Sequence, residues 1–333
     1  MEKRVIFEDQ WILVTGAAGF IGSGVVRYLN DLGYHNLLLV DDFYATDKWK
    51  NLVGKKFVDI ISKKDLFRFL TGKEQKIAAI FHLGACSSTV ESNADYLLEN
   101  NYRFSVNLAK YALRNGQRFI YASSAATYGN GSRGFDDQTE LSKLRPLNMY
   151  GYSKHLFDLW LEREKALDKV VGLKYFNVFG PNEYHKNRMA SMVWKMAKTA
   201  QSEKPISLFQ SNHPDYADGE QKRDFIYVKD AVRFTCRFIE SSLQKVGGIF
   251  NIGTGSAVTW NRLAHAVFKA VKKPPCIQYI PMPVDLKAQY QNYTKARMAK
   301  YFAIDQAASS FLTPIEDAVE DYVQNYILRD AQW

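Results

Sequence analysis

Short runs of mostly apolar residues alternate with longer amphipathic stretches over the first half of the chain. The stretches between runs place apolar residues at helical spacing, as at Ile21, Val25 and Leu29. This alternation predicts an α/β fold with a Rossmann-type, doubly wound parallel sheet. Five runs are typical of strands buried on both faces of such a sheet: residues 11–15, 37–40, 77–82, 118–123 and 170–176.

The regular alternation stops near residue 180. Beyond Pro181 the elements are less regular, with more aromatic and basic residues. We therefore expect residues 1–180 to form a dinucleotide-binding Rossmann domain, to which the chain returns around 223–255. Residues 181–333 are expected to form mainly a smaller α/β substrate-binding domain. Within it we predict a helix over 187–202.

Three glycines follow the first predicted strand with the spacing G-x-x-G-x-x-G. Small residues let the chain turn sharply and let backbone N–H groups approach a pyrophosphate. The second predicted strand ends in an acid about twenty residues further on, where contact with the adenosine ribose is expected. This arrangement indicates a dinucleotide site, formed by Gly16, Gly19, Phe20, Ile21, Gly22 and Asp41.

The residues after this strand leave the choice of dinucleotide open. A carboxylate hydrogen-bonds a ribose 2′-hydroxyl, whereas a 2′-phosphate needs a cation. Asp42 therefore favours NAD and Lys48 favours NADP, unless Lys48 is only a solvated loop charge.

More candidate cofactor contacts follow the third predicted strand. Asn100 or Asn101, in a helical stretch over 91–115, can reach the cofactor or serve helix packing. Cofactor contacts gather at the carboxyl ends of strands in doubly wound sheets. We expect them here at Leu83, Gly84, Ala85, Cys86 and Ser87.

Tyr150 and Lys154 lie four residues apart, on one face of a predicted helix. A free tyrosine has a pKa of about 10 and is a poor base at neutral pH. A nearby ammonium and a cationic nicotinamide favour the phenolate, which can accept a hydroxyl proton. Ser124, at the end of the preceding strand, is expected to hydrogen-bond the same substrate oxygen. These residues predict a cofactor-dependent catalytic site.

Composition narrows the partners, metal sites and cellular location that we expect. The net charge of +9 comes from scattered residues, with no run of five Lys or Arg, so nucleic acid is not an expected partner. No metal site is expected, because His and acids lack metal-ligand spacing. The cysteines, odd in number and far apart, are expected to be reduced. Without a signal peptide or an apolar run of ~20 residues, we expect a cytoplasmic protein that does not bind membranes.

Arg223 has two interpretations. Its guanidinium fork matches the oxygens of a diphosphate. Alternatively, it forms a structural salt bridge to Asp224 or Asp230.

Together these features resemble the extended short-chain dehydrogenase/reductases over essentially the whole chain. More specific segments are H-L-G-A-C-S-S-T, Y-A-S-S-A-A-T-Y-G, N-M-Y-G-Y-S-K, F-N-V-F-G-P-N-E-Y-H-K and M-A-S-M-V. They are similar to the ADP-L-glycero-D-manno-heptose 6-epimerase family, for which H-K-x-x-M-A-S is the discriminating motif. The resemblance implies an isomerase in lipopolysaccharide biosynthesis that inverts C6 of ADP-D-glycero-D-manno-heptose by transient oxidation to a ketone and hydride return.

The same resemblance implies a cofactor, an assembly and further site residues. The cofactor is tightly bound NADP, with NAD as the alternative, and the assembly is a homo-oligomer such as a pentamer. Catalytic roles fall to Ser124, Tyr150, Lys154 and Lys186. Residues added to the cofactor site are Lys48 and Lys63, toward the 2′-phosphate, and Val178 and Lys186. The substrate-binding residues are Ser124, Asn177, Arg188, Lys195, Phe209, Asn212, Arg223 and Tyr290.

The chain departs from the family pattern at four places. Asn187-Arg188 replaces Gly-Ser, Lys195 replaces a histidine, the loop over 211–222 is longer, and Asp42 replaces Asn. One rival function is another nucleotide-sugar epimerase, such as a UDP-hexose 4-epimerase. A rival of another class is a non-catalytic cofactor-binding sensor. A 4,6-dehydratase is disfavoured because alanines follow Ser124 where its acid pair is expected.

Overall fold

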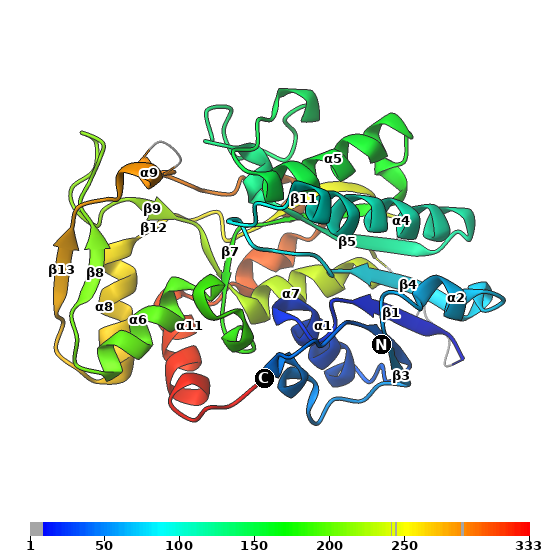
Figure 1. Ribbon diagram of the computed structural model, residues 1–333, viewed down its shortest axis with the longest axis horizontal. Coiled ribbons are helices and arrows are strands. Elements are labelled where there is room, and N and C mark those ends of the chain that lie inside the picture. Colours follow the sequence, from blue (N-terminus) through cyan, green and yellow to red (C-terminus); the bar gives the residue numbers. More distant parts are fainter. Residues whose placement is uncertain (1–8, 241, 244, 288–289) are drawn as a thin grey trace.

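The computed structural model describes residues 9–240, 242–243, 245–287 and 290–333, with a seven-stranded parallel sheet at its centre (Figure 1). The strand order is β11-β6-β5-β4-β1-β2-β3. The order reverses direction between β1 and β4, and ligands of doubly wound sheets bind at the carboxyl ends of strands at such a point. The strands are β1 (Trp11–Thr15), β2 (Leu37–Val40), β3 (Asp59–Ile61), β4 (Ile77–His82), β5 (Arg118–Ser124), β6 (Val171–Tyr175) and β11 (Gly248–Ile252).

Helices cover both faces of this sheet. Successive strand residues point to opposite faces, so Leu13 packs toward α2, α4 and α5, whereas Ile12 and Val14 pack in the cluster that contains α1 and α7. In Figure 1, α4 and α5 lie on one side of the sheet and α1 and α7 on the other. The bounds are α1 (Phe20–Asp31), α2 (Leu66–Leu70), α4 (Phe104–Arg114), α5 (Met149–Arg163) and α7 (Val228–Cys236). The predicted doubly wound α/β fold is confirmed.

The remaining elements lie mostly beside the sheet, around three two-stranded pairs. These strands are β7 (Asn177–Phe179) with β10 (Phe225–Tyr227), β9 (Lys222–Arg223) with β12 (Val258–Thr259), and β8 (Ile206–Phe209) with β13 (Ile277–Ile280). The helices are α3 (Ala94–Leu97), α6 (Met192–Gln201), α8 (Trp260–Val271), α9 (Val284–Lys287), α10 (Ala299–Ile304) and α11 (Ile315–Asp321). The division into two domains at residue 180 stays a prediction.

Two predicted helices differ from the observed ones. The stretch over 91–115 begins at α3 and passes through a π-helical turn, Leu98–Arg103, before α4. The helix predicted from residue 187 begins at Met192, because Asn187 has non-helical angles (φ 47°, ψ −113°) and Ser191 caps the helix through the Trp194 N–H. Among the described residues, no helix is both long and apolar enough to cross a bilayer.

Candidate functional site

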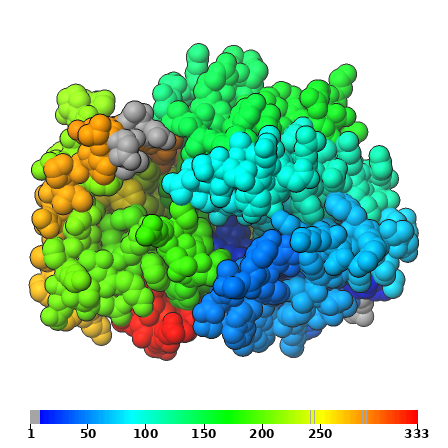
Figure 2. Space-filling view, viewed as in Figure 1, coloured from blue at the N-terminus to red at the C-terminus, as the bar shows by residue number. Residues whose placement is uncertain are grey.

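A cavity of about 680 Å³ lies at the carboxyl ends of β1, β4, β5 and β6. Figure 2 shows the surface hollowed where the blue N-terminal segment meets the cyan and green segments that follow it in the sequence. Every residue predicted to contact the cofactor, from Gly16 in the glycine loop to Lys186, lines this cavity. Of the predicted substrate residues, Ser124 and Asn177 line it as well.

The glycine loop has no room for side chains. Gly16 has φ +66°, and a Cβ there would lie 2.6 Å from the Cα of Gly84. A Cβ on Gly22 would lie 2.0 Å from the Gly16 carbonyl oxygen. The glycines thus let β1, the strand-end turn after β4 and the start of α1 meet closely, which leaves the backbone accessible to a diphosphate. This cradle fits a dinucleotide.

Two acids and two lysines meet at the end of β2. Asp41 Oδ2 accepts a hydrogen bond from the Ala18 N–H (2.8 Å), and its Oδ1 pairs with the Lys48 ammonium at 2.6 Å. The Lys63 ammonium lies 3.9 Å from Asp42 Oδ2. Lys48 is therefore a partner of Asp41, and the interpretation of Lys48 as a merely solvated loop charge is wrong.

Asn100 and Asn101, both in the π-helical turn, make different contacts. Asn100 lines the cavity and accepts a hydrogen bond from Lys63 at 2.5 Å. Asn101 is buried and bonds the backbone N–H and carbonyl of Cys86, and it also donates to Ser153. Wide turns of this kind are frequent at functional sites. Asn101 serves packing, and Asn100 faces the ligand space.

Tyr150 and Lys154 enter the cavity from α5. Asn148 caps this helix by accepting the Gly151 N–H at 2.8 Å. Burial raises the pKa of Tyr150, and a hydrogen bond with Ser124 opposes that change. The Lys154 ammonium donates to the Ala122 carbonyl at 2.9 Å. The Ser124, Tyr150 and Lys154 side chains therefore meet at one end of β5.

Burial lowers the pKa of Lys154 to about 8, and the Asp158 carboxylate opposes this shift. Asp158 is fully buried one helical turn further along α5 and accepts hydrogen bonds from Tyr121 and Ser123, both at 2.9 Å. The buried Lys174 ammonium lies 3.6 Å from it. Asp158 thus adds negative charge behind the Tyr–Lys pair, a feature absent from our sequence prediction.

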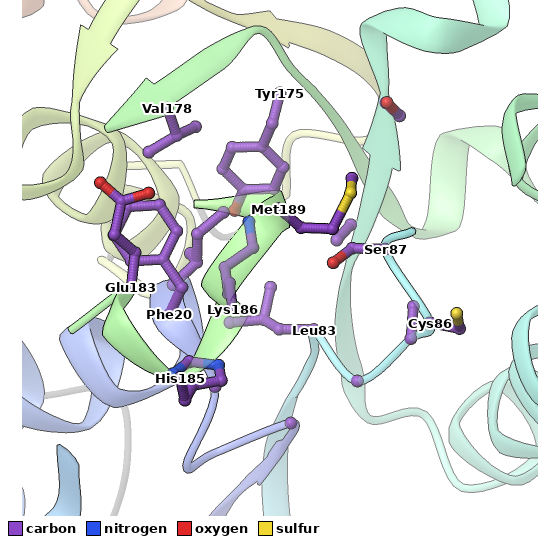
Figure 3. A pocket seen from close by; sticks show the side chains of 18 of the residues that line it. Phe20, Leu83, Cys86, Ser87, Tyr175, Val178, Glu183, His185, Lys186 and Met189 are labelled. Atoms are coloured by element: carbon purple, nitrogen blue, oxygen red, sulfur yellow. The ribbon is translucent and has the colours of Figure 1, made fainter. Parts of the chain in front are cut away.

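Lys186 enters the cavity from a short 3₁₀ turn, Tyr184–Met189 (Figure 3). Its ammonium lies 5.3 Å from the centre of the Phe20 ring. Burial lowers the pKa of Lys186, the Glu183 carboxylate opposes this shift, and Lys195 reinforces it. Lys186 is thus a partly buried amine that lines the same cavity as Tyr150 and Lys154.

Glu183 fixes the turn that carries Lys186. Its carboxylate accepts hydrogen bonds from the Ser191 N–H (2.5 Å) and hydroxyl (2.6 Å) and from the Tyr322 hydroxyl (3.0 Å). As a single acid in an irregular segment, Glu183 has no periodic signal by which sequence reasoning finds it.

Arg223, Tyr290 and Phe209 form a cluster outside the cavity lining. The Arg223 guanidinium lies 4.9 Å from the Tyr290 ring centre and 5.8 Å from that of Trp260. Trp260 donates to the Tyr290 hydroxyl at 3.0 Å, and Phe209 contacts the Tyr290 ring edge-on. Trp260 also lines the cavity. The aromatic cluster therefore adjoins the cavity through Trp260, which the sequence prediction missed.

The structural salt bridge proposed for Arg223 is wrong in the described part of the chain. Asp224 accepts the N–H groups of Thr254, Gly255 and Ala296. Asp230 accepts the N–H and hydroxyl of Thr313. Both carboxylates are engaged elsewhere, and Arg223 donates to the Lys222 carbonyl and packs on aromatic rings.

Besides Phe209, Arg223 and Tyr290, three more predicted substrate residues lie outside the cavity lining. Arg188 and Asn212 are exposed, and Lys195 is near enough to Lys186 to affect its pKa without lining the cavity. Asn177 lines the cavity, and its amide donates to the Asp224 carbonyl at 3.0 Å.

The described residues contain no cluster of three or more His, Cys, Asp or Glu suited to a metal ion. The three cysteines are free.

A glycine-lined cavity at the carboxyl ends of a parallel sheet, with a Tyr–Lys pair at its wall, defines a Rossmann-type protein of the short-chain dehydrogenase/reductase class. The NAD dependent epimerase/dehydratase family matches residues 12–253. An ADP-L-glycero-D-manno-heptose-6-epimerase of Nitratidesulfovibrio vulgaris is 48% identical over 95% of this chain and 97% of its own length. One of Fusobacterium nucleatum is 41% identical, covering 97% and 99%.

The structure of the Helicobacter pylori ADP-L-glycero-D-manno-heptose-6-epimerase has a TM-score of 0.79 at 27% identity, covering 97% of this chain and 98% of that one. The chain therefore belongs to the NAD dependent epimerase/dehydratase family and, within it, to the ADP-L-glycero-D-manno-heptose-6-epimerases.

Proposed function

We propose that this chain interconverts ADP-D-glycero-D-manno-heptose and ADP-L-glycero-D-manno-heptose, using a retained nicotinamide dinucleotide. One observation carries the proposal: two proton-exchanging side chains, Tyr150 on α5 and Lys186 on the 184–189 turn, line one cavity from different elements. Inversion needs an acid or base near the oxygen in each of two sugar orientations. We infer the substrate from the names of the relatives, and we infer from its lining residues that the cavity is where the reaction takes place.

Tyr150 and Ser124 form the first half of the proposed site. The Ser124 hydroxyl orients the substrate oxygen, and the Tyr150 phenol exchanges a proton with it. Burial raises the pKa of Tyr150, so positive charge is needed to favour its phenolate. The Lys154 ammonium supplies part of that charge, and its bond to the Ala122 carbonyl fixes its position.

Lys186 forms the second half. Its lowered pKa eases the loss of a proton, and Glu183 limits how far the pKa falls. Lys186 therefore serves the sugar orientation that presents the other face of the reacting carbon. A nicotinamide held in the glycine cradle would accept a hydride from the carbinol carbon and return it to the ketone, because direct proton removal from an unactivated carbinol carbon is too unfavourable.

We assign the glycine cradle, with Asp41 and Asp42 at the end of β2, to the dinucleotide. We assign the cluster of Arg223, Tyr290, Phe209 and Trp260 to the nucleotide part of the substrate. Arg223 there presents its guanidinium among aromatic rings, an arrangement suited to a diphosphate beside a base. We expect a homo-oligomer in the cytoplasm; size-exclusion chromatography with light scattering checks the assembly.

Incubation of the purified protein with ADP-D-glycero-D-manno-heptose tests the function. NMR should show the L-glycero epimer forming without net consumption of added dinucleotide. Turnover of UDP-glucose to UDP-galactose, with no action on ADP-heptose, would show the rival 4-epimerase instead.

A substrate deuterated at C6 distinguishes the enzyme from a sensor. Rapid quenching should find deuterium on the bound nicotinamide during turnover. A protein that binds dinucleotide and sugar nucleotide but transfers no deuterium would be a sensor.

A further inference from the structure

Asp42 has a carboxylate oxygen without a hydrogen-bond donor. Its Oδ1 accepts bonds from the Ser62 hydroxyl (2.6 Å) and the Lys63 N–H (3.2 Å). Its Oδ2 is shielded from solvent and has no donor within hydrogen-bond distance among the described residues. The Tyr44 hydroxyl is the neighbouring donor of the protein, and burial and the Asp42 carboxylate raise its pKa. An unsatisfied buried acceptor costs about 1–3 kcal/mol, and more when charged. Asp42 lines the cavity, so a ligand hydroxyl can supply the missing bond once the carboxylate turns Oδ2 out of its shielded position.

The cation best placed for a 2′-phosphate is already engaged. Lys48 pairs with Asp41 at 2.6 Å, and both side chains are largely buried. Asp41 also holds the glycine loop through the Ala18 N–H. Moving Lys48 to a phosphate would leave the Asp41 charge without its ammonium partner inside this loop, which is strongly unfavourable.

Lys63, the second lysine at this end of the cavity, also has partners in the protein. Its ammonium donates to Asn100 at 2.5 Å and faces Asp42 at 3.9 Å. Two ammoniums therefore balance two carboxylates at this end of the cavity. A phosphate monoester would add about −1.5 to −2 charges. The exposed Lys64 lines a neighbouring hollow beside Asp42 and is the remaining cation to test.

On these contacts we propose that Asp42 determines the cofactor, and that this chain retains NAD in preference to NADP. The proposal rests on the dinucleotide site of the proposed function. A 2′-hydroxyl donates the hydrogen bond that Asp42 Oδ2 lacks, whereas a 2′-phosphate has only acceptors and negative charge. The proposal reverses the NADP preference that the family resemblance implies.

The dinucleotide released by denaturing the purified full-length protein, identified by mass, tests the proposal. NAD is the expected result, and NADP alone would overturn it. If the protein purifies empty, calorimetric titration should give NADP binding at least tenfold weaker than NAD. Equal or tighter NADP binding would overturn it.

Variants separate Asp42 from the lysines. Asp42→Asn keeps the shape and removes the charge, so the NADP-to-NAD affinity ratio should rise at least tenfold. Lys64→Met should keep the NAD preference. Lys50→Met is the matched control, because Lys50 pairs with Asp47 on the surface. An unchanged ratio in Asp42→Asn would contradict the proposal, as would a changed ratio in Lys64→Met.

This readout is independent of the epimerase assay. A protein that binds NAD but does not convert ADP-heptose contradicts only the proposed function. An active ADP-heptose epimerase that carries NADP contradicts only the assignment to Asp42.

Discussion

The Asn51 side chain donates to the Asn182 carbonyl at 3.0 Å and so links two loops of the cavity. The same amide donates to the Ala18 carbonyl, also at 3.0 Å. Ala18 belongs to the glycine loop, and Asn182 directly precedes Glu183, which fixes the turn of Lys186. The glycine loop and the turn that carries Lys186 are thus joined by one buried amide.

We expect Asn51→Ala to lower the free energy of unfolding by about 1–3 kcal/mol, because two carbonyl oxygens lose a buried donor. Asn51→Asp should cost more, since it sets an acceptor against both. Urea denaturation measures the difference. The control Asn130→Ala alters an exposed loop and should stay within about 0.5 kcal/mol. Equal effects of Asn51→Ala and Asn130→Ala would contradict the role of the link.

Tyr150→Phe should lower kcat at least a hundredfold, at the lower end of general acid–base contributions, while the bound dinucleotide remains. Tyr152→Phe is the matched control, because Tyr152 lies on the same helix and is 46% exposed. Steady-state rates with ADP-heptose, and absorbance of the released dinucleotide, measure both effects. A full rate in Tyr150→Phe would rule the phenol out.

Lys186→Met should likewise lower kcat at least a hundredfold, with rates compared per molecule of protein-bound dinucleotide. Lys198→Met, an exposed lysine on α6, should keep the wild-type rate. Single-turnover measurements sharpen the test. If Lys186 serves one sugar orientation, Lys186→Met should no longer epimerise the substrate. It should still transfer deuterium to the nicotinamide from one of the two epimers, but not from the other. Equal loss from both epimers would argue for a structural role.

The rate should fall on the alkaline side with an apparent pKa near 8, as the Lys154 ammonium loses its proton. Asp158→Asn removes the carboxylate that holds this pKa up, so the fall should move to lower pH. Unfolding driven by Lys154 does not explain this fall. The pKa of Lys154 is lower in the folded chain than its ordinary value of 10.5, so its contribution to the free energy of unfolding rises with pH from about 8 to 10.5. A pH profile of kcat/KM for both proteins measures the shift; an unmoved profile would contradict the coupling.

Gly22→Ala should reduce dinucleotide binding at least tenfold, or about 1.4 kcal/mol. The added Cβ would lie 2.0 Å from the Gly16 carbonyl oxygen, and neither backbone segment can yield without moving the cradle. Gly54→Ala is the comparison, because nothing lies within 4 Å of its added Cβ, although its φ of +76° adds strain. It should lower the melting temperature and keep the cofactor. Calorimetric titration separates the two effects.

Local patterns predicted the sheet well. Apolar runs placed β1, β2 and β4 at their observed bounds, because burial on both faces leaves an uninterrupted apolar signature. The strand-end residues could then be placed at one cavity, since parallel strands end at a common edge. Asn187 shows the limit: the helix was predicted to begin there, whereas the observed φ of Asn187 is positive.

The cluster of Arg223, Tyr290 and Trp260 could not be assembled from the sequence. Trp260 meets Arg223 and Tyr290 only through tertiary packing of separate segments, and no spacing in the chain encodes that meeting. Glu183 and Asp158 were missed for a related reason. Each is a lone acid whose partners come from other elements, so neither leaves a periodic signal.

The π-helical turn at Leu98–Arg103 rotates α4 about the helix axis relative to α3. A turn of this kind holds one residue more than an α-helical turn, and one residue corresponds to about 100° around the axis. Deleting either asparagine would therefore restore a regular helix and turn α4 relative to α3. Ser105 would swing away from His82, to which it is hydrogen-bonded at 2.8 Å. At this position, a one-residue deletion should disturb the site more than a substitution of either asparagine.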